Sequence, residues 1–129
     1  MPKRILVADD NELIRRQVRR ILGQDQQIEI CAEAGNGVEA IRKARQYRPD
    51  LVLLDVFMPE MNGLVALREI KKTAPGLPIV IFTLHDVGGI QAESTKAGAD
   101  AFLLKANSGV ALVATIYELL GLYPEPIAA

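Results

Sequence analysis

The sequence has few of the residues on which many enzyme and metal sites depend. It contains one cysteine, Cys31, and one histidine, His85, among 129 residues. A single cysteine excludes an internal disulfide and any metal site built from several cysteines. A single histidine excludes a histidine-rich zinc site and makes a Ser-His-Asp triad a poor candidate.

The sequence also lacks an excess of charge and a long apolar run. Fifteen basic and sixteen acidic residues give a net charge of −1, so the domain has no electrostatic footprint for nucleic acid. The apolar run near the N-terminus, from Ile5 to Ala8, is too short for a signal peptide or a membrane span. We therefore expect a cytoplasmic, soluble protein whose domain binds neither nucleic acid nor a membrane.

What the sequence does contain is enough apolar material for one compact domain. Half of the residues are apolar and 24% are charged, and a chain of this length can bury a core without metal or disulfide support. Gly121 is expected to end the last helix, and Pro124 and Pro126 follow it. We predict a domain over residues 1–121 and a tail, or the start of a linker, over residues 122–129.

Short apolar runs alternate with helical patterns along the whole chain. The runs cover residues 5–8, 28–34, 51–54, 79–82 and 101–104. Four of them are apolar at nearly every position, which is typical of parallel strands covered on both faces. The run from Ile28 to Ala34 partly alternates with polar residues, as an edge strand does.

The segments between the runs have the apolar spacing of helices. Their ranges are 11–22, 37–48, 63–74, 87–97 and 108–120, with Ser108 as the expected N-cap of the last. The fourth pattern is the weakest because Gly88 and Gly89 lie near its start, and we expect this helix to be the most mobile. Five strands alternating with five helices predict an α/β three-layer sandwich with right-handed crossovers.

Polar side chains follow the apolar runs where each strand should end. Asp9 and Asp10 follow the first run, Asp55 the third, Thr83 the fourth and Lys105 the fifth. In an open parallel sheet, ligands bind at the carboxyl ends of the strands. We therefore expect these five side chains to converge at one edge.

Three carboxylates close together repel one another unless a cation neutralises them. Oxygen ligands favour a hard ion, magnesium first, while Lys105 and Thr83 suit an anionic phosphoryl group, which an aspartate can accept as an acyl phosphate. Taken singly, each residue has an ordinary explanation: a helix cap, a turn residue or a solvated lysine. The combination at four strand ends is what indicates a site.

These residues resemble a known family. Asp9-Asp10, Asp55 with the following Met58-Pro59-Glu60-Met61-Asn62-Gly63, Thr83, and Lys105 after Gly98-Ala99-Asp100-Ala101-Phe102 are similar to the receiver domain of bacterial two-component response regulators. The resemblance covers Ile5 to about Leu120. The opening Ala-Asp-Asp and the Gly-Val-Glu-Ala-Ile segment resemble the LuxR/NarL/FixJ-type branch, which carries a DNA-binding domain. No helix-turn-helix fits in the residues left over, so we expect that domain either to lie beyond the proline-containing tail or not to exist.

The resemblance implies a flavodoxin-like (βα)5 fold with a parallel sheet of order 2-1-3-4-5. It implies that Asp55 accepts a phosphoryl group from a sensor histidine kinase or phosphotransfer protein. Mg²⁺ would be held by Asp10, Asp55 and the carbonyl of Phe57, with Asp9 binding it through water.

The remaining roles implied by the resemblance concern the response to phosphorylation. Lys105 would pair with the phosphoryl oxygens, Thr83 would donate a hydrogen bond to the phosphoryl group, and Phe102 would reorient with Thr83. Phe57 and His85 would flank the approach of the hydrolytic water. The domain would then switch partner or homodimer contacts in a phosphorelay, with transcription as an expected output.

The sequence departs from the family pattern at three positions. Ala106 replaces the proline that usually follows the lysine through a cis peptide bond, and a cis bond to a non-proline costs about 3 kcal/mol. Leu84 replaces a small residue after Thr83, and Phe102 lacks the hydroxyl of a tyrosine.

Two other functions stay open at this point. An aspartyl-phosphate phosphatase of the haloacid-dehalogenase type needs a second aspartate two residues after the nucleophile, where this sequence has Phe57. A phosphorylation-independent receiver-like interaction module would not need all five polar residues. The basic residues Arg15, Arg16, Arg19 and Arg20 indicate either a solvated helix face or a docking surface for an acidic partner.

Overall fold

Five parallel strands and five helices alternate along the part of the chain that the structure, a computed structural model, describes: residues 1–59, 61–107 and 109–124. The strands are β1 (Lys3–Ala8), β2 (Ile28–Ala34), β3 (Leu51–Leu54), β4 (Ile79–Thr83) and β5 (Ala101–Leu104). The helices are α1 (Glu12–Leu22), α2 (Gly37–Tyr47), α3 (Gly63–Thr73), α4 (Ile90–Ala97) and α5 (Gly109–Leu120).

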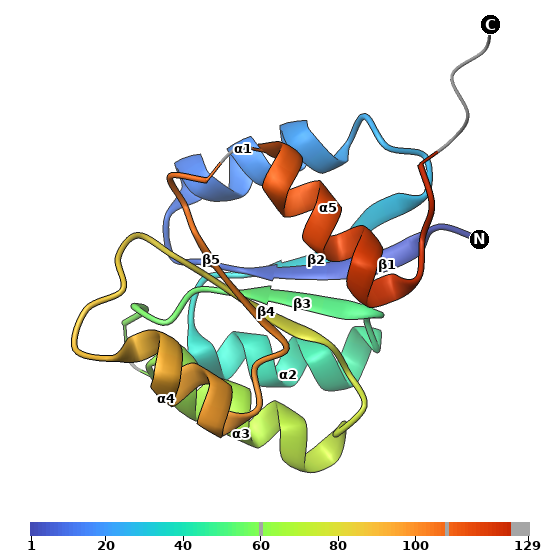
Figure 1. Ribbon diagram of the computed structural model, residues 1–129. Coiled ribbons are helices and arrows are strands. Elements are labelled where there is room, and N and C mark those ends of the chain that lie inside the picture. The colour runs from blue at the N-terminus through green and yellow to red at the C-terminus, as the bar shows by residue number, and fades with distance from the viewer. Residues whose placement is uncertain (60, 108, 125–129) are drawn as a thin grey trace, which may run out of the picture.

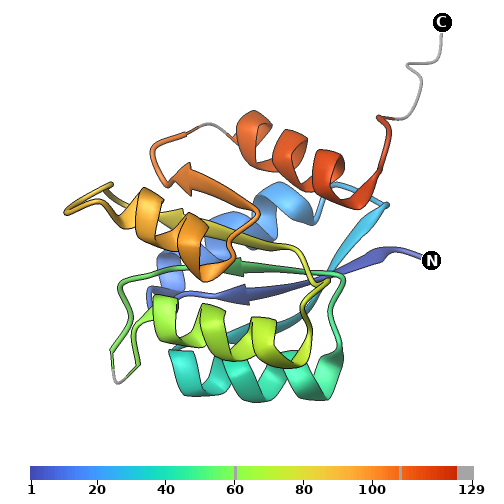
Figure 2. The same cartoon turned by 60° about the horizontal axis from the view of Figure 1, so that its bottom comes forward.

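The sheet has the order β2-β1-β3-β4-β5 with all neighbours parallel. This order confirms the flavodoxin-like α/β fold. Helices α1 and α5 cover one face, and α2, α3 and α4 cover the other (Figure 1). Turning the molecule shows α2 and α3 side by side on their face (Figure 2).

The strands bury both faces, as their apolar runs predict. In β1, Ile5 and Val7 pack into the cluster beneath α1 and α5, whereas Leu6 and Ala8 pack into the cluster beneath α2, α3 and α4. The other central strands alternate in the same way because successive side chains of a strand point to opposite faces. Two apolar cores thus hold the sheet rigidly between its helices.

Three helices begin at an asparagine that caps them. The side chain of Asn11 accepts hydrogen bonds from the N–H groups of Leu13 and Ile14. Asn36 and Asn62 cap α2 and α3 in the same manner, which satisfies backbone donors that a helix start leaves free. These local signals place the helix starts close to the predicted ones.

Helix α4 begins later than the sequence predicts. The pattern indicates a start at Val87, but the helix begins at Ile90. Gly88 and Gly89 have φ angles of 61° and 78°, in the left-handed region that a right-handed helix does not contain. The expected N-cap Ser108 of the last helix and Pro126 of the tail lie outside the described residues.

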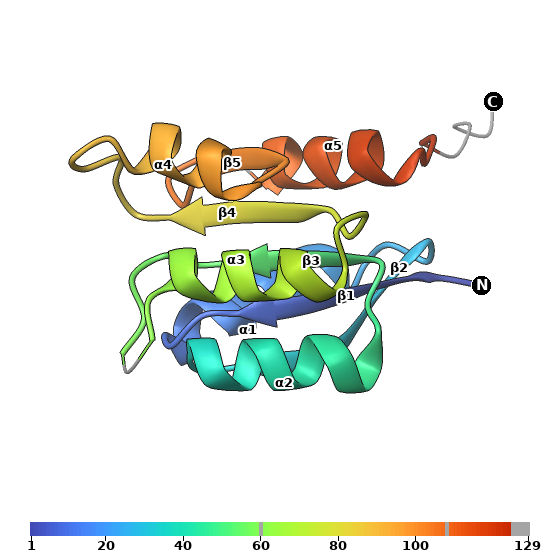
Figure 3. The ribbon, with the colours of Figure 1, turned by 90° about the horizontal axis from the view of Figure 1, so that it is seen from below.

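The loops that follow β3 and β4 gather at the end of the molecule opposite to the N-terminus (Figure 3). Gly63 allows α3 to begin directly against the end of β3. A Cβ atom at this position would lie 2.1 Å from the carbonyl oxygen of Asp55, so only glycine fits there. The start of α3 is thereby fixed behind the Asp55 backbone.

Candidate phosphoacceptor site

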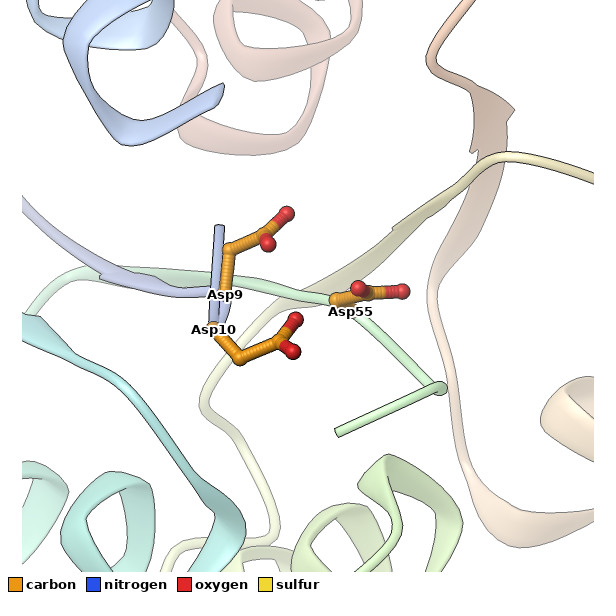
Figure 4. Close-up of side chains that lie close together, drawn as sticks. All are labelled: Asp9, Asp10 and Asp55. Atoms are coloured by element: carbon orange, nitrogen blue, oxygen red, sulfur yellow. The ribbon is translucent and has the colours of Figure 1, made fainter. Parts of the chain in front are cut away.

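The five polar residues predicted from the strand ends meet at one edge of the sheet. Asp9 and Asp10 follow β1, Asp55 follows β3, and Lys105 follows β5. Thr83 is the last residue of β4 rather than the first residue beyond it. The three aspartates lie close together (Figure 4), and each offers one carboxylate oxygen such that these atoms are all within 4.8 Å of one another.

Lys105 joins two of the three carboxylates. Its Nζ lies 2.7 Å from Oδ2 of Asp9 and 3.0 Å from Oδ2 of Asp55. All three of these side chains are buried, with exposures of 6% for Lys105, 3% for Asp9 and 5% for Asp55. Asp10 is exposed and has no ion pair or side-chain hydrogen bond in the described residues.

Backbone donors orient the remaining oxygens of the buried pair. The N–H of Asn11 donates to Oδ1 of Asp9 at 2.9 Å, and the N–H of Phe57 donates to Oδ1 of Asp55 at 3.2 Å. Each buried carboxylate is thus held by its own following loop on one oxygen and by Lys105 on the other. The phenyl ring of Phe57 is 51% exposed at the rim.

Burial and charge shift the titration of the central pair. Burial raises the pKa of Asp55; Lys105 opposes this effect, and the neighbouring Asp9 carboxylate adds to it. Burial alone lowers the pKa of Lys105, but its contacts with Asp9 and Asp55 outweigh burial and raise the pKa above its usual value. Lys105 is therefore a firmly charged ammonium beside an aspartate whose ionised form is disfavoured.

Thr83 contributes a hydroxyl that has no hydrogen-bond partner among the described residues. Its side chain is fully buried, and Oγ1 makes no hydrogen bond within the described part of the chain. A buried hydroxyl without a partner costs free energy, and an acceptor arriving at this edge of the sheet would relieve that cost. Such an unsatisfied donor is expected beside a site that receives an oxygen-rich group.

Phe102 lies in β5 on the face covered by α4. Its ring is half-buried and packs against the cluster beneath α2, α3 and α4. In the sheet, Phe102 is paired with Ile81, two residues before Thr83. The two residues assigned to the switch therefore lie on neighbouring strands.

The loop after Lys105 accommodates alanine in place of the usual proline. The Lys105–Ala106 peptide is trans, since no cis bond occurs in the described residues. Asn107 closes the turn: its Oδ1 accepts from the N–H of Leu104 at 2.8 Å, and its own N–H donates to the Leu104 carbonyl at 2.9 Å. These two bonds hold the end of β5 where Lys105 reaches the carboxylates.

The structure separates the four arginines of α1 into two pairs. Arg16 and Arg20 are exposed, which agrees with a solvated face and with a docking surface alike. Arg15 and Arg19 instead form ion pairs with Glu12 and Glu33. Sequence reasoning found only the helix face, because the link to Glu33 depends on how β2 lies beside α1.

The arrangement suits a hard cation together with an anionic oxygen ligand. Three carboxylates face a single ammonium, so negative charge remains to bind a metal ion. All the available ligands are oxygens, which suits magnesium and leaves positions for water or phosphate. Lys105 adds a charged donor beside Asp9 and Asp55, and Thr83 adds a buried hydroxyl at the end of β4.

A family model described as the response regulator receiver domain matches residues 5–117. The chain is a response regulator receiver domain. This family is one of phosphoacceptor signalling domains rather than enzymes with a separate substrate, and it implies a histidine kinase as partner. None of the helices in the described residues has the length and apolar character that a membrane crossing needs.

Relatives of this receiver domain occur alone and within longer proteins. The chemotaxis protein CheY of Halobacterium salinarum is 36% identical over 120 residues, which cover 93% of this chain and 98% of that protein. The protein-glutamate methylesterase/protein-glutamine glutaminase of Pyrococcus abyssi is 39% identical over 84% of this chain but 30% of its own length. The chain spans only 30% to 48% of several such relatives.

Solved structures agree with the fold and with the branch. A LuxR-family two-component response regulator from Aurantimonas sp. SI85-9A1 superposes with a TM-score of 0.88 at 30% identity, covering 94% of this chain and 86% of that one. The CheX–CheY–BeF3–Mg²⁺ complex of Borrelia burgdorferi matches with a TM-score of 0.86 at 21% identity, covering 92% and 90%. The second likeness supports the fold.

Proposed function

We propose that this receiver domain accepts a phosphoryl group on Asp55 from a phosphohistidine of a sensor histidine kinase or phosphotransfer protein. The observation that carries the proposal is the pairing of Asp55 Oδ2 with the buried Lys105 ammonium at 3.0 Å. This pair lies beside two further carboxylates, and the neighbouring strand β4 ends at Thr83, whose hydroxyl makes no hydrogen bond among the described residues. A carboxylate so placed is a nucleophile with an anion site prepared next to it.

The cation that fits this donor set is Mg²⁺. We propose that Asp10, Asp55 and the carbonyl of Phe57 hold it and that Asp9 binds it through water. When bound, Mg²⁺ neutralises the carboxylates and the phosphoryl oxygens, so that an anionic nucleophile can approach an anionic donor. The magnesium in the Borrelia complex supports the choice of ion.

The transfer step needs no other reactant. A carboxylate oxygen of Asp55 forms a bond to phosphorus while the bond from phosphorus to the histidine nitrogen breaks, and its electron pair returns to the imidazole. Lys105 then pairs with a phosphoryl oxygen instead of Asp55 Oδ2, and the Thr83 hydroxyl donates to another. The movement of Thr83 frees space beside β5, into which Phe102 reorients.

The output of this switch is a change in partner or homodimer contacts. We place the signalling unit in residues 1–121 and treat residues 122–129 as a tail or linker. The relatives carry different names: one solved structure is a LuxR-family two-component response regulator, and one relative is a protein-glutamate methylesterase/protein-glutamine glutaminase. In a longer protein of the LuxR type, the output would be transcription.

Binding of a phosphoryl analogue tests the proposal. Beryllofluoride should bind with one equivalent per chain, only with Mg²⁺, and the protein should not turn over phosphate esters. An Asp55→Asn variant, which keeps the shape of the side chain, should bind none. Turnover of esters would indicate a phosphatase, and a folded wild-type protein that ignores the analogue would indicate an interaction module that works without phosphorylation.

A further inference from the structure

Arg15 connects the metal-binding loop to the edge of the sheet. Its guanidinium donates through Nη1 to the backbone carbonyl of Asp9 and through Nε to Oε1 of Glu33 at 3.1 Å. A third contact, from Nη2, goes to Glu12 in the first turn of α1. The Arg15 side chain is only 18% exposed. Its three acceptors and its partial burial therefore hold the planar guanidinium in one orientation.

The Asp9 backbone is therefore held from two sides. Its N–H donates to the carbonyl of Ala34 in β2 at 2.9 Å, and its carbonyl accepts from Arg15. This carbonyl belongs to the peptide that joins Asp9 to Asp10. Because the Asp10 side chain is exposed and has no partner of its own in the described residues, the direction of its carboxylate depends on that peptide.

We propose that Arg15 is a positioning residue for the magnesium site, which fixes the Asp9–Asp10 peptide so that the Asp10 carboxylate faces Asp55. Glu33 and Glu12 hold the guanidinium in place. The inference rests on the proposed function, because it assigns Arg15 a part in binding the Mg²⁺ of that same site. Arg15 touches neither the metal nor the phosphoryl group.

Geometry and charge predict opposite effects of removing Arg15. The guanidinium is a positive charge near a cation site, so its loss should tighten Mg²⁺ binding if charge were its only influence. If Arg15 orients the peptide, its loss should weaken Mg²⁺ binding, because groups that orient metal ligands typically affect affinity tenfold or more. The sign of the change separates the two roles.

Arg19 provides a matched control on the same helix. It lies one turn further along α1 and pairs with the same two glutamates, at 2.6 Å to Glu33 and 2.8 Å to Glu12. It makes no contact with Asp9 among the described residues. Arg19→Gln therefore removes the same charge and the same kinds of ion pair while leaving the Asp9 carbonyl contact intact.

The test is Mg²⁺ titration by isothermal calorimetry of the full chain, with circular dichroism to verify folding. Wild-type protein must bind Mg²⁺; if it does not, the proposed function itself fails. Given binding, Arg15→Gln should raise the Kd about tenfold, and Arg19→Gln should leave it within about twofold. An unchanged or lower Kd for Arg15→Gln, or an equal loss in both variants, would overturn the inference.

A second variant serves if Arg15→Gln does not fold. Arg15→Lys keeps the charge, but its single ammonium cannot hold the Asp9 carbonyl and both glutamates together. We expect its Kd to rise at least threefold, and a wild-type Kd would count against the inference. With acetyl phosphate as donor, the Mg²⁺ concentration for half-maximal phosphorylation should rise while the rate at saturating Mg²⁺ changes little.

Discussion

At Asp55, burial and pairing act in opposite directions. The carboxylate is almost fully buried, yet Lys105 and the Phe57 N–H favour its charged form. Burial prevails, so the pKa of Asp55 in the folded, metal-free protein lies above its usual value. The proposed function requires Asp55 to be ionised, so the folded protein bears the free-energy cost of a buried carboxylate.

Because of this shift, replacing Asp55 by a neutral residue should stabilise the metal-free fold by an amount that depends on pH. A carboxyl whose pKa is raised on folding stabilises the fold below its unfolded pKa of about 3.8, and that contribution is lost as the pH rises through the folded pKa. In metal-free buffer, Asp55→Asn should therefore raise the melting temperature by roughly 3 °C or more at pH 7.

The gain should shrink as the pH falls through the folded pKa and should vanish well below the unfolded pKa, because Asp55 is then protonated in both the folded and the unfolded chain. Melting curves followed by circular dichroism in EDTA across this pH range would measure it. Glu118→Gln, which neutralises an exposed carboxylate on α5, provides the control and should show no comparable gain. A lower melting temperature for Asp55→Asn at pH 7 would mean that the Lys105 pair outweighs burial.

We expect Phe57 to control how long the phosphoryl group stays on Asp55. Its exposed ring lies two residues after Asp55. The exposed Leu84 and His85 follow Thr83 at the same edge of the sheet. An apolar ring cannot orient a hydrolytic water, so loss of the phosphoryl group should take minutes or longer. Phe57→Asn should shorten the lifetime severalfold, as followed by release of labelled phosphate.

Val110→Asn is the matched control for this experiment, since it changes an exposed apolar residue on α5, a helix that contributes none of the five site residues. Its lifetime should equal that of the wild type. Loss within seconds from the unmodified protein, or a longer lifetime for Phe57→Asn, would refute the shielding role and direct attention to His85.

At the scale of elements, the helices show what sequence patterns can predict. The starts and ends of α1, α2 and α3 follow from asparagine caps and from residues that stop a helix, which are local signals. The start of α4 does not, because the sequence shows two glycines but not the sign of their φ angles. Asn107, which closes the turn after β5, likewise escaped prediction because its role depends on the path of that loop.

Helix α4 is the element that we expect to respond to phosphorylation. Ser94 is its one fully buried residue in the described structure, and the Ser94 hydroxyl has no partner there. Helix α3, by contrast, buries five residues. Left-handed glycines stand at its start, Gly89 offers no capping side chain, and the exposed Asp86 Oδ1 accepts from the Gln91 N–H at 3.0 Å. We therefore expect α4 to need little free energy to move.

Hydrogen exchange should reveal this difference. Beryllofluoride with Mg²⁺ should change amide exchange in α4 and around Phe102 more than in α2. The β4–α4 loop connects Thr83 to α4, and the sheet connects Thr83 to the strand of Phe102, whereas α2 has neither connection. Exchange followed by mass spectrometry measures it, with Asp55→Asn under the same conditions as control. A uniform change along the chain, or none in α4, would contradict this route.

At the scale of the whole molecule, the sequence predicted that the polar residues at the strand ends meet at one edge of the sheet. It did not predict which of their atoms form ion pairs and hydrogen bonds. Parallel strands place their carboxyl ends at one edge, so Asp9, Asp55 and Lys105 had to approach one another. Which oxygens Lys105 would join, and that Arg15 would reach the Asp9 carbonyl from α1, depend on side-chain placement across elements far apart in sequence. The sheet order came from family resemblance, because strand pattern alone permits several orders.

Phosphorylation of Asp55 is the most direct test of its role as the phosphoryl acceptor. With acetyl phosphate and Mg²⁺, intact-mass analysis should find one phosphoryl group per wild-type chain and none on Asp55→Ala, while both give the same circular dichroism. Asp86→Asn, a change at an exposed aspartate on the β4–α4 loop, should label like the wild type. Phosphate incorporated at an unchanged level in folded Asp55→Ala would contradict the assignment of the acceptor.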